Sequence, residues 1–276
     1  MGILRRILDS TLHPVGLHLT RFPVPVSEPE HNHDASIANC REIEGCYRDL
    51  LFPEIPERAN RPGLMQQLLG TSTGEAMYIL GSLYRSLSCP GDVCEFGIAQ
   101  GATSALLANE IRGTDKKLWL FDSFEGLPRP TEKDKLIDDI FNLGSMEAYT
   151  GQMACDVSMV KNRLETIAFP LNRVEIVPGF IEKTIHLPRL PSSVSFAYVD
   201  FDFYEPILIA LNYLDRTLSR GGHIVVDDYG WFSSGAQTAV DEFMSVHASD
   251  YEITFPIKSA GHFVVLRRSS SGAGDR

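Results

Sequence analysis

Two stretches of the chain decide the fold: FAYVDFDFYEP at 196–206 and GGHIVVDDYG at 221–230. Each contains a short apolar run that ends in a pair of acids: Asp200 and Asp202, then Asp227 and Asp228. In an open parallel α/β sheet the carboxyl ends of the strands meet at one edge, and ligands bind there. The two stretches therefore predict four carboxylates gathered at one edge of a parallel sheet.

Four carboxylates at one edge repel one another, so the arrangement persists only if another charge compensates them. A hard divalent cation with oxygen ligands is the obvious candidate. Taken singly, an acid after a strand is more often a helix N-cap or a turn residue. For two pairs at two strand ends, we favour the metal site over a set of caps.

The quoted stretches belong to a longer alternation of strand and helix patterns that begins near Gly91. The pattern predicts strands at 92–97, 117–122, 173–178, 194–200, 222–227, 250–256 and 261–267. It predicts helices at 102–112, 156–168, 204–218 and 234–247, with a short one near 180–186. Such alternation implies a doubly wound α/β fold, a mainly parallel seven-stranded sheet with helices on both faces. The last two strands follow each other directly and should form an antiparallel hairpin at one edge.

A mostly helical pattern from 41 to 87 precedes the first strand. Thr71 or Ser72 is placed to cap a helix that runs to about Leu87, and Glu75 stands at capping-box spacing from Ser72. This region is expected to cover one end of the sheet.

The alternation stops between Ser123 and Cys155, where glycines, prolines and a charged run interrupt it. A long insertion of this kind is more often a functional lid than padding. We therefore assign a main domain to 41–268 with a lid insertion at 124–155, followed by a disordered tail at 269–276.

The first 40 residues read as an amphipathic helix over 1–21 and a proline-containing linker over 22–38. Asp9 interrupts the apolar region and no small-residue cleavage site follows, so a signal peptide is not indicated. Packing on its own domain or on a partner subunit is the favoured role of the helix. The alternative is contact with an anionic membrane surface.

Composition narrows the class of protein. At 276 residues, 43% hydrophobic and 22% charged, the chain fits one large globular domain with extensions. A formal net charge of −11 argues against nonspecific binding to nucleic acid, which requires a basic footprint. Five cysteines without metal-site spacing indicate reduced thiols in a cytoplasmic protein. No apolar run approaches the roughly 18 residues of a membrane span.

The first strand-to-helix junction, VCEFGIAQGATS at 93–104, has the features of a ligand loop. Gly97 and Gly101 let the backbone turn tightly, and the following helix offers free N–H groups. The GxGxxG fingerprint of dinucleotide binding is absent. Glu95 can meet a ligand's ammonium group, and Asp122 can accept hydrogen bonds from ribose hydroxyls. Together they favour an adenosyl ligand that also carries an amino-acid end.

These motifs resemble a known family. EFGIAQG at 95–101 is similar to the first motif of class I S-adenosylmethionine-dependent methyltransferases. More specifically, the chain resembles the macrocin-type O-methyltransferases, metal-dependent enzymes that methylate sugar hydroxyls on macrolide and aminocoumarin antibiotics. The motifs that carry this likeness are FDSFEGLP (121–128), VPGF (177–180), DFDFYEP (200–206) and GGHIVVDDYG (221–230). It covers roughly residues 64–267. Phe201 departs from the small residue usual between the two acids of the D-x-D motif, which bears on the acceptor pocket.

The resemblance implies roles for individual residues. The Mg²⁺ ligands it implies are Asp200, Asp227 and Asp228, and Asp202 matches the general base. The cofactor-binding residues it implies are Glu95, Gly97, Gln100, Gly101, Ser104, Asp122 and Ser123. Since neighbouring strand residues point to opposite faces, Asp227 and Asp228 can share a metal only if the strand ends by Asp228.

The leading hypothesis is an S-adenosylmethionine- and Mg²⁺-dependent O-methyltransferase that acts on a sugar hydroxyl of a glycosylated natural product or a surface glycan. The nearest alternative is the same chemistry on a catechol or other phenol. An NAD-dependent oxidoreductase is disfavoured by the missing fingerprint. A non-catalytic nucleotide-binding module is disfavoured by the retained acids. We expect no nucleic-acid partner, and a homo-oligomer whose contacts come from the first helix and the insertion.

Overall fold

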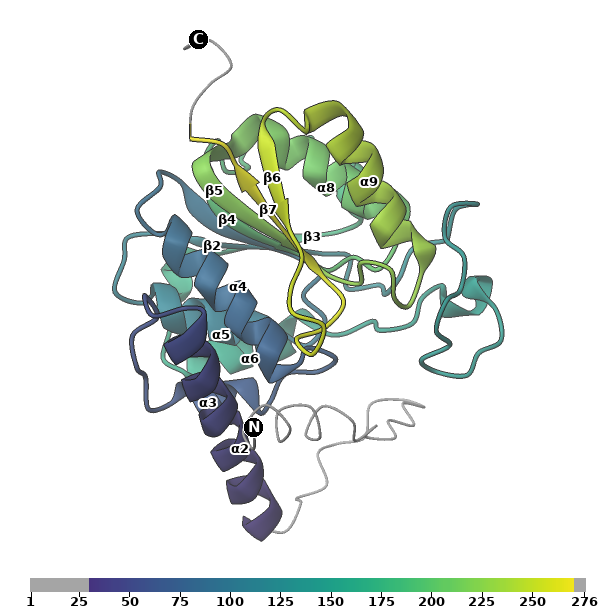
Figure 1. Ribbon diagram of the computed structural model, residues 1–276. Coiled ribbons are helices and arrows are strands. Elements are labelled where there is room, and N and C mark those ends of the chain that lie inside the picture. Colours follow the sequence, from purple (N-terminus) through teal and green to yellow (C-terminus); the bar gives the residue numbers. More distant parts are fainter. Residues whose placement is uncertain (1–29, 271–276) are drawn as a thin grey trace.

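The computed structural model describes residues 30–270, and the expected helix over 1–21 therefore lies outside the described residues. A seven-stranded sheet forms the centre of the molecule, with strand order β3-β2-β1-β4-β5-β7-β6 (Figure 1). Its strands are β1 (Asp92–Phe96), β2 (Leu118–Asp122), β3 (Val174–Pro178), β4 (Val194–Val199), β5 (Leu218–Val226), β6 (Tyr251–Thr254) and β7 (Val264–Arg268). All seven coincide with predicted strands, which confirms the predicted α/β class.

The sheet is parallel from β3 to β5 and antiparallel at the β6 edge. The parallel pairs are β1–β2, β1–β4, β2–β3 and β4–β5, whereas β7 pairs antiparallel with both β5 and β6. The predicted edge hairpin is therefore confirmed. Because the strand order reverses between β1 and β4, ligands are expected at the carboxyl ends of these two strands.

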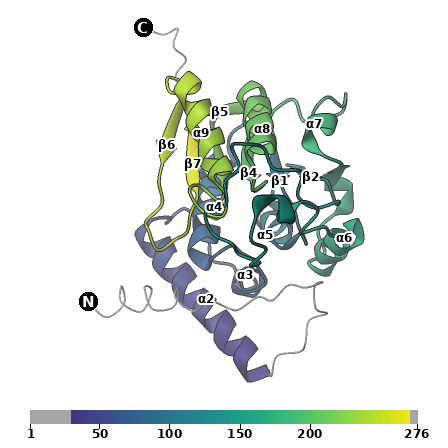
Figure 2. The same ribbon diagram turned by 90° about the vertical axis from the view of Figure 1, so that its right-hand side faces the viewer.

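Helices cover both faces, as predicted. The helix before β1 and the helices between β1 and β3 lie on one face of the sheet. The helices between β3 and β6 lie on the other face (Figures 1 and 2). The first face holds α4 (Thr73–Ser86), α5 (Ala102–Ile111) and α6 (Val157–Thr166). The second holds α7 (Ile181–Thr184), α8 (Tyr204–Thr217) and α9 (Ser234–His247). The alternation of strand side chains gives each face its own apolar core.

The region before β1 is helical, and it differs from the prediction at its start. Helix α2 covers Glu30–Leu50 and the short α3 covers Arg61–Met65. Residues 30–38 were expected in the linker, but they form the first turns of α2, because Pro29 is the last proline before the helix. The predicted cap is confirmed at Ser72, whose hydroxyl accepts a hydrogen bond from the Glu75 N–H at 3.0 Å.

The insertion contains one short helical turn, η1 (Met146–Tyr149), and a small apolar cluster of its own. Leu127 and Tyr149 from the insertion pack with Phe203, which follows β4, and Phe232, which follows β5. The insertion therefore rests on the loops that carry the acids. Among the described helices, none is long and apolar enough to cross a membrane.

Candidate active site

The acids of the two quoted stretches lie where their strands end. The Asp200 N–H donates to the Phe96 carbonyl at 2.7 Å, and the Asp227 N–H donates to the Val199 carbonyl at 2.9 Å. These bonds continue the sheet by one residue beyond β4 and β5. The backbone of both acids is thus fixed by neighbouring strands, so that their side chains start from defined positions.

Asp202 and Asp228 then turn out of the strand direction with left-handed backbones. Their φ angles are 61° and 58°, a conformation that residues other than glycine adopt at a cost of about 1–3 kcal/mol. In these conformations carboxylate oxygens of Asp200, Asp202 and Asp228 all lie within 4.8 Å of one another. Strain of this kind at two acids of one site is typical of functional positions.

Asp227 faces a different direction from Asp228, because the positive φ of Asp228 turns that residue out of the strand direction. Its Oδ2 accepts a hydrogen bond from the Tyr198 hydroxyl at 2.7 Å, on the face that α4 covers. The same hydroxyl lies 3.4 Å from Asp200 Oδ2. The structure therefore brings Asp200, Asp202 and Asp228 together as a possible set of metal ligands, with Asp227 placed beside that set.

Glu75 is a fifth carboxylate of the site, which the sequence analysis had assigned only to the cap of α4. Its side chain is buried and accepts a hydrogen bond from the Tyr198 hydroxyl at 3.4 Å, and after burial itself the nearby charge of Asp227 contributes to the raised pKa of Glu75. The capping-box spacing was visible in the sequence, but nothing in it showed that α4 begins beside the end of β5. The term acid cluster is used below for Glu75, Asp200, Asp202, Asp227 and Asp228.

Burial and mutual repulsion dominate the electrostatics of the acid cluster. Burial first, and then the neighbouring acids, hold the pKa of Asp200, Asp202 and Asp228 well above the usual range of a carboxyl. The pKa of Glu75 is raised for the same two reasons. No Lys, Arg or His side chain within residues 33–270 forms an ion pair with the cluster. An all-oxygen set of this charge suits Mg²⁺.

The loop after β1 explains why its two glycines are needed. Gly97 has a φ of 85°, and a Cβ there would lie 1.8 Å from the Asp200 carbonyl oxygen. Gly101 has a φ of 77° and precedes the first turn of α5. The chain therefore passes close to the end of β4 and delivers the N-terminus of α5 to the same edge as the acids. Gln100 lies between them in this loop, half-buried.

Glu95 is the most distinctive group of this loop. It is fully buried in β1, and burial raises the pKa of its carboxyl to about 8. Ser104 donates a hydrogen bond to Oε2 at 2.5 Å, whereas Oε1 has no hydrogen-bond partner among the described residues. A buried oxygen without a partner costs free energy, and the ammonium group of an amino-acid end would satisfy it. Glu95 thus fits S-adenosylmethionine, and Ser104 supports Glu95.

Asp122 and Ser123 stand at the end of β2 and organise two loops. Asp122 Oδ2 accepts hydrogen bonds from the N–H groups of Ile98 and Ala99, and Oδ1 accepts one from Phe124 at 2.7 Å. The Ser123 hydroxyl donates to the Gly126 carbonyl at 2.8 Å. Asp122 therefore holds the loop after β1, whereas Ser123 organises the loop that follows β2. Asp122 retains one lone pair on Oδ1 that no described donor uses, and the ribose role stays a prediction.

The rim of the site joins three segments that are distant in sequence. Trp231, after β5, donates a hydrogen bond to Asp138 of the insertion at 3.0 Å and stacks on His262 with ring centroids 5.8 Å apart. The Tyr229 N–H donates to the His262 carbonyl at 2.7 Å. Phe232 is instead buried with the insertion. Tyr229 and Trp231 are therefore the aromatic residues that we place at the rim of the site.

Comparison with known proteins agrees with this arrangement. The model of the macrocin-O-methyltransferase family matches residues 81–267. A rhamnosyl-tetracenomycin-C 4'-O-methyltransferase of Streptomyces olivaceus is 30% identical over 144 residues, which cover 51% of this chain and 53% of that protein. The mycinamicin III 3''-O-methyltransferase of Micromonospora griseorubida is 28% identical over 170 residues, 59% of this chain and 64% of that protein. The matched part thus spans less than two thirds of these relatives.

Solved structures share the fold. The O-methyltransferase NovP superposes with a TM-score of 0.62 at 20% sequence identity, covering 87% of this chain and 99% of NovP. The calicheamicin methyltransferase CalS11 gives a TM-score of 0.58 at 18% identity, covering 90% and 95% of the two chains. At these identities the likeness concerns the architecture of the sheet and its helices.

Proposed function

The chain belongs to the macrocin O-methyltransferase family, and from this membership we propose that it transfers the methyl group of S-adenosylmethionine to a sugar hydroxyl with the help of Mg²⁺. The acceptor class is a glycosylated natural product or a surface glycan. The family match and the names of the relatives support the sugar acceptor.

The observation that carries the Mg²⁺ part of the proposal is the convergence of Asp200, Asp202 and Asp228. Their oxygens approach within 4.8 Å of one another at the carboxyl end of the sheet, although no positively charged side chain of the described residues forms an ion pair with them. The site also places Glu95 and the loop after β1 at the same edge. Under this proposal a cation and the amino-acid end of the cofactor would bind side by side.

When bound, S-adenosylmethionine supplies an electrophilic methyl group and Mg²⁺ supplies positive charge that lowers the pKa of an acceptor hydroxyl. The residues of the chain hold and orient the partners. Asp200 and Asp228 would hold the ion, and Asp227 is the further carboxylate proposed as its ligand. Asp202 would accept the proton of the hydroxyl as general base. Methyl transfer requires the attacking oxygen in line with the sulfur, so positioning by these side chains should dominate the rate.

Cofactor residues keep the predicted roles within this proposal. Glu95 would pair with the methionine ammonium, Gly97 and Gly101 would allow close approach of the backbone, and Asp122 would accept a hydrogen bond from ribose. Tyr229 and Trp231 would border the acceptor, together with the insertion. The cytoplasmic location and the homo-oligomer expected from the sequence stay predictions.

The test is a methylation assay with labelled S-adenosylmethionine and two acceptor panels, deoxysugar glycosides and catechols, each with Mg²⁺ and with a chelator. The proposal expects Mg²⁺-dependent transfer to glycosides and loss of transfer in Asp202→Asn. Preferential transfer to catechols would move the acceptor to the phenol class. Equal rates with chelator would remove Mg²⁺ from the proposal, and no turnover with cofactor bound would favour a non-catalytic module.

A further inference from the structure

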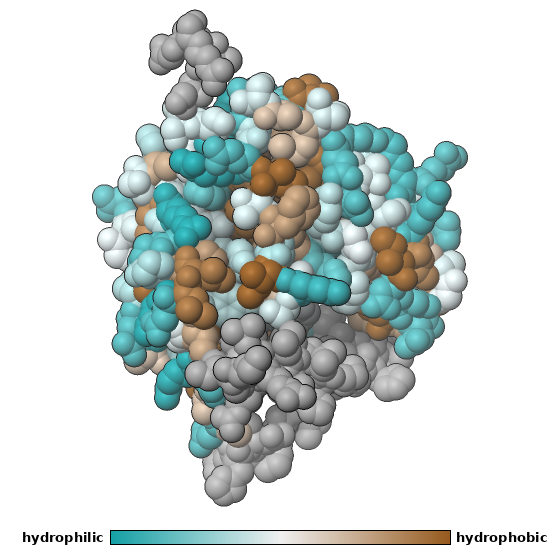
Figure 3. Space-filling view, in the orientation of Figure 1, coloured by the Kyte–Doolittle hydropathy of each residue, from teal (hydrophilic) through white to brown (hydrophobic). Residues whose placement is uncertain are grey.

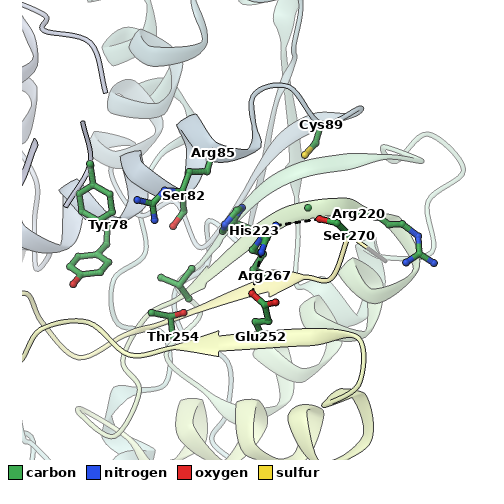
Figure 4. A pocket seen from close by; sticks show the side chains of 13 residues that line it. Tyr78, Ser82, Arg85, Cys89, Arg220, His223, Glu252, Thr254, Arg267 and Ser270 are labelled. Carbon is green, nitrogen blue, oxygen red and sulfur yellow. Dashed lines mark hydrogen bonds and ion pairs between the residues drawn. The ribbon is translucent and has the colours of Figure 1, made fainter. Parts of the chain in front are cut away.

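A cavity lies away from the acid cluster, on the face of the sheet that α4 partly covers (Figure 4). Its volume is about 510 Å³, within the range of about 300–1,000 Å³ typical of small-molecule sites. His223, which lines it, stands four residues before Asp227 on β5, so the two sites are separated by roughly 13 Å of extended strand. No role in the proposed methyl transfer involves the cavity.

The register of the sheet explains its floor. His223 on β5 pairs with Arg267 on β7, and Arg267 pairs with Glu252 on β6. Paired residues of neighbouring strands point to the same face. Two residues further along the strands, the pair of Thr254 and Val265 lies on the same face and completes the floor of the cavity. In Figure 4 Arg267 lies between His223 and Glu252, with interactions drawn to Glu252 and Ser270.

Helix α4 supplies the wall. Tyr78, Ser82 and Arg85 are spaced by four and three residues, so they share one helical face, and all three line the cavity. Beyond them no helix formed by residues 30–270 covers β6 and β7 on this face (Figure 1). Hydrophilic and hydrophobic residues lie next to one another there (Figure 3).

The charge of the cavity is opposite to that of the protein. The chain carries a formal net charge of −11, yet three arginines and one glutamate line the cavity: Arg85, Arg220, Arg267 and Glu252. Burial first, and then the positive charges of Arg267 and Arg85, lower the pKa of His223 to about 4. Positive potential concentrated in a concave site attracts anions.

Both central guanidinium groups retain free donors. Arg85 uses Nε for Glu54 and Nη2 for the Leu51 carbonyl, and Arg267 uses Nη1 for Glu252 and Nη2 for Ser270. A guanidinium has five N–H donors, so each retains three that no described acceptor takes. Arg220 extends away from His223 in Figure 4. Arg85 and Arg267 thus both line the cavity with N–H donors that no described acceptor takes.

We propose that this cavity is a second ligand site, which binds a small organic anion through Arg85 and Arg267. The recognised group is an oxyanion, a phosphate or a carboxylate, because two oxygens of either match the planar fork of a guanidinium. The cavity is larger than such a group. Tyr78 and Phe52, which line its other end, provide an apolar wall for the remainder of the ligand.

The experiment is calorimetric titration of the full chain with inorganic phosphate and, separately, with citrate, in a buffer free of both anions. At least one anion should bind, and the better of the two identifies the oxyanion. Arg85→Gln/Arg267→Gln should weaken that binding at least about tenfold, since a hydrogen bond to a charged group contributes about 1.5–3 kcal/mol. Arg220→Gln removes the same charge from a side chain directed away from His223 and should change affinity little.

Two controls keep the test decisive. Saturating S-adenosylhomocysteine should not displace the anion, since the cofactor loop lies at another edge of the sheet. Arg267→Gln alone should fold normally, because its pair with Glu252 is exposed, and it should also weaken binding. The proposal is wrong if neither anion binds at millimolar concentration, if the variants bind as well as the parent, or if S-adenosylhomocysteine competes.

Discussion

Two clusters of charge in this protein are built in opposite ways. One lies between α2, α3 and α5, where Arg61 bridges Glu44 at 2.6 Å and Glu110 at 2.6 Å, and Arg58 adds a contact to Glu110 at 2.9 Å. The other is the acid cluster, where five carboxylates gather with no ion pair from residues 33–270. The first is balanced by the chain itself, and the second is not.

The carboxyl pKa values of the two clusters shift in opposite directions for this reason. Burial alone would raise the pKa of Glu110, but hydrogen bonds and charge from Arg61 outweigh it and lower that pKa. In the acid cluster nothing outweighs burial, so the pKa values of Asp200, Asp202 and Asp228 rise. A balanced buried cluster is structural, whereas an unbalanced one is costly until a ligand completes it. This contrast supports the cation site more strongly than the presence of acids alone.

Breaking the balanced cluster should have the largest effect. Arg61→Met leaves Glu44 and Glu110 buried without their shared partner, so the free energy of unfolding should fall by about 3–5 kcal/mol. Urea unfolding followed by circular dichroism measures it. Lys117→Gln is the control, because its pair with Glu175 is exposed and should contribute less than about 1 kcal/mol. Equal small losses in both variants would show that the buried network is not structural.

Neutralising Glu95 should have a smaller effect, and on binding. Glu95→Gln removes the charge that would face the cofactor ammonium, so affinity for S-adenosylhomocysteine should fall by roughly 10- to 100-fold, equivalent to about 1.5–3 kcal/mol. The Ser104 hydrogen bond to the side chain can persist in this variant. Calorimetric titration checks the prediction, and an unchanged affinity would mean that the partnerless Oε1 serves another purpose.

The pH dependence of stability should have opposite signs in the two clusters. The raised pKa of Asp228 means that the folded chain binds more protons than the unfolded one, so stability falls as pH rises from the unfolded pKa through the folded pKa. Glu110 has the opposite sign, and its contribution is lost as pH falls. Without metal, Asp228→Asn should therefore gain stability relative to the parent as pH rises above about 4. Parallel stability curves for the two proteins would contradict this.

The sequence predicted the sheet and the place of the site because those signals are local. Apolar runs mark β4 and β5, acids mark their ends, and the parallel topology brings those ends together. The glycines at 97 and 101 were interpretable for the same reason, since each must have a positive φ.

The features of the site that the sequence did not predict depend on contacts between distant segments of the chain. Glu75 joins the acid cluster across 123 residues to Tyr198, and Arg61 meets Glu110 across 49 residues. Neither pairing leaves a periodic signal in the chain. The separate directions of Asp227 and Asp228 depend on the positive φ of Asp228, and an aspartate in a sequence does not by itself indicate a positive φ. The cationic cavity likewise depends on the register of three strands against α4.

The most direct test of the contrast is a calorimetric titration of the metal-free chain with Mg²⁺. The parent protein should bind one ion. Asp228→Asn should bind it at least about tenfold more weakly, because a hydrogen bond or ligand bond to a charged group is lost. Asp115→Asn should bind it as tightly as the parent does. Asp115 is an exposed acid outside the cluster, so it controls for the loss of one charge. Binding in the parent that fails only in Asp228→Asn would establish the acid cluster as a cation site. No Mg²⁺ binding in the parent, or equal binding in all three proteins, would contradict it.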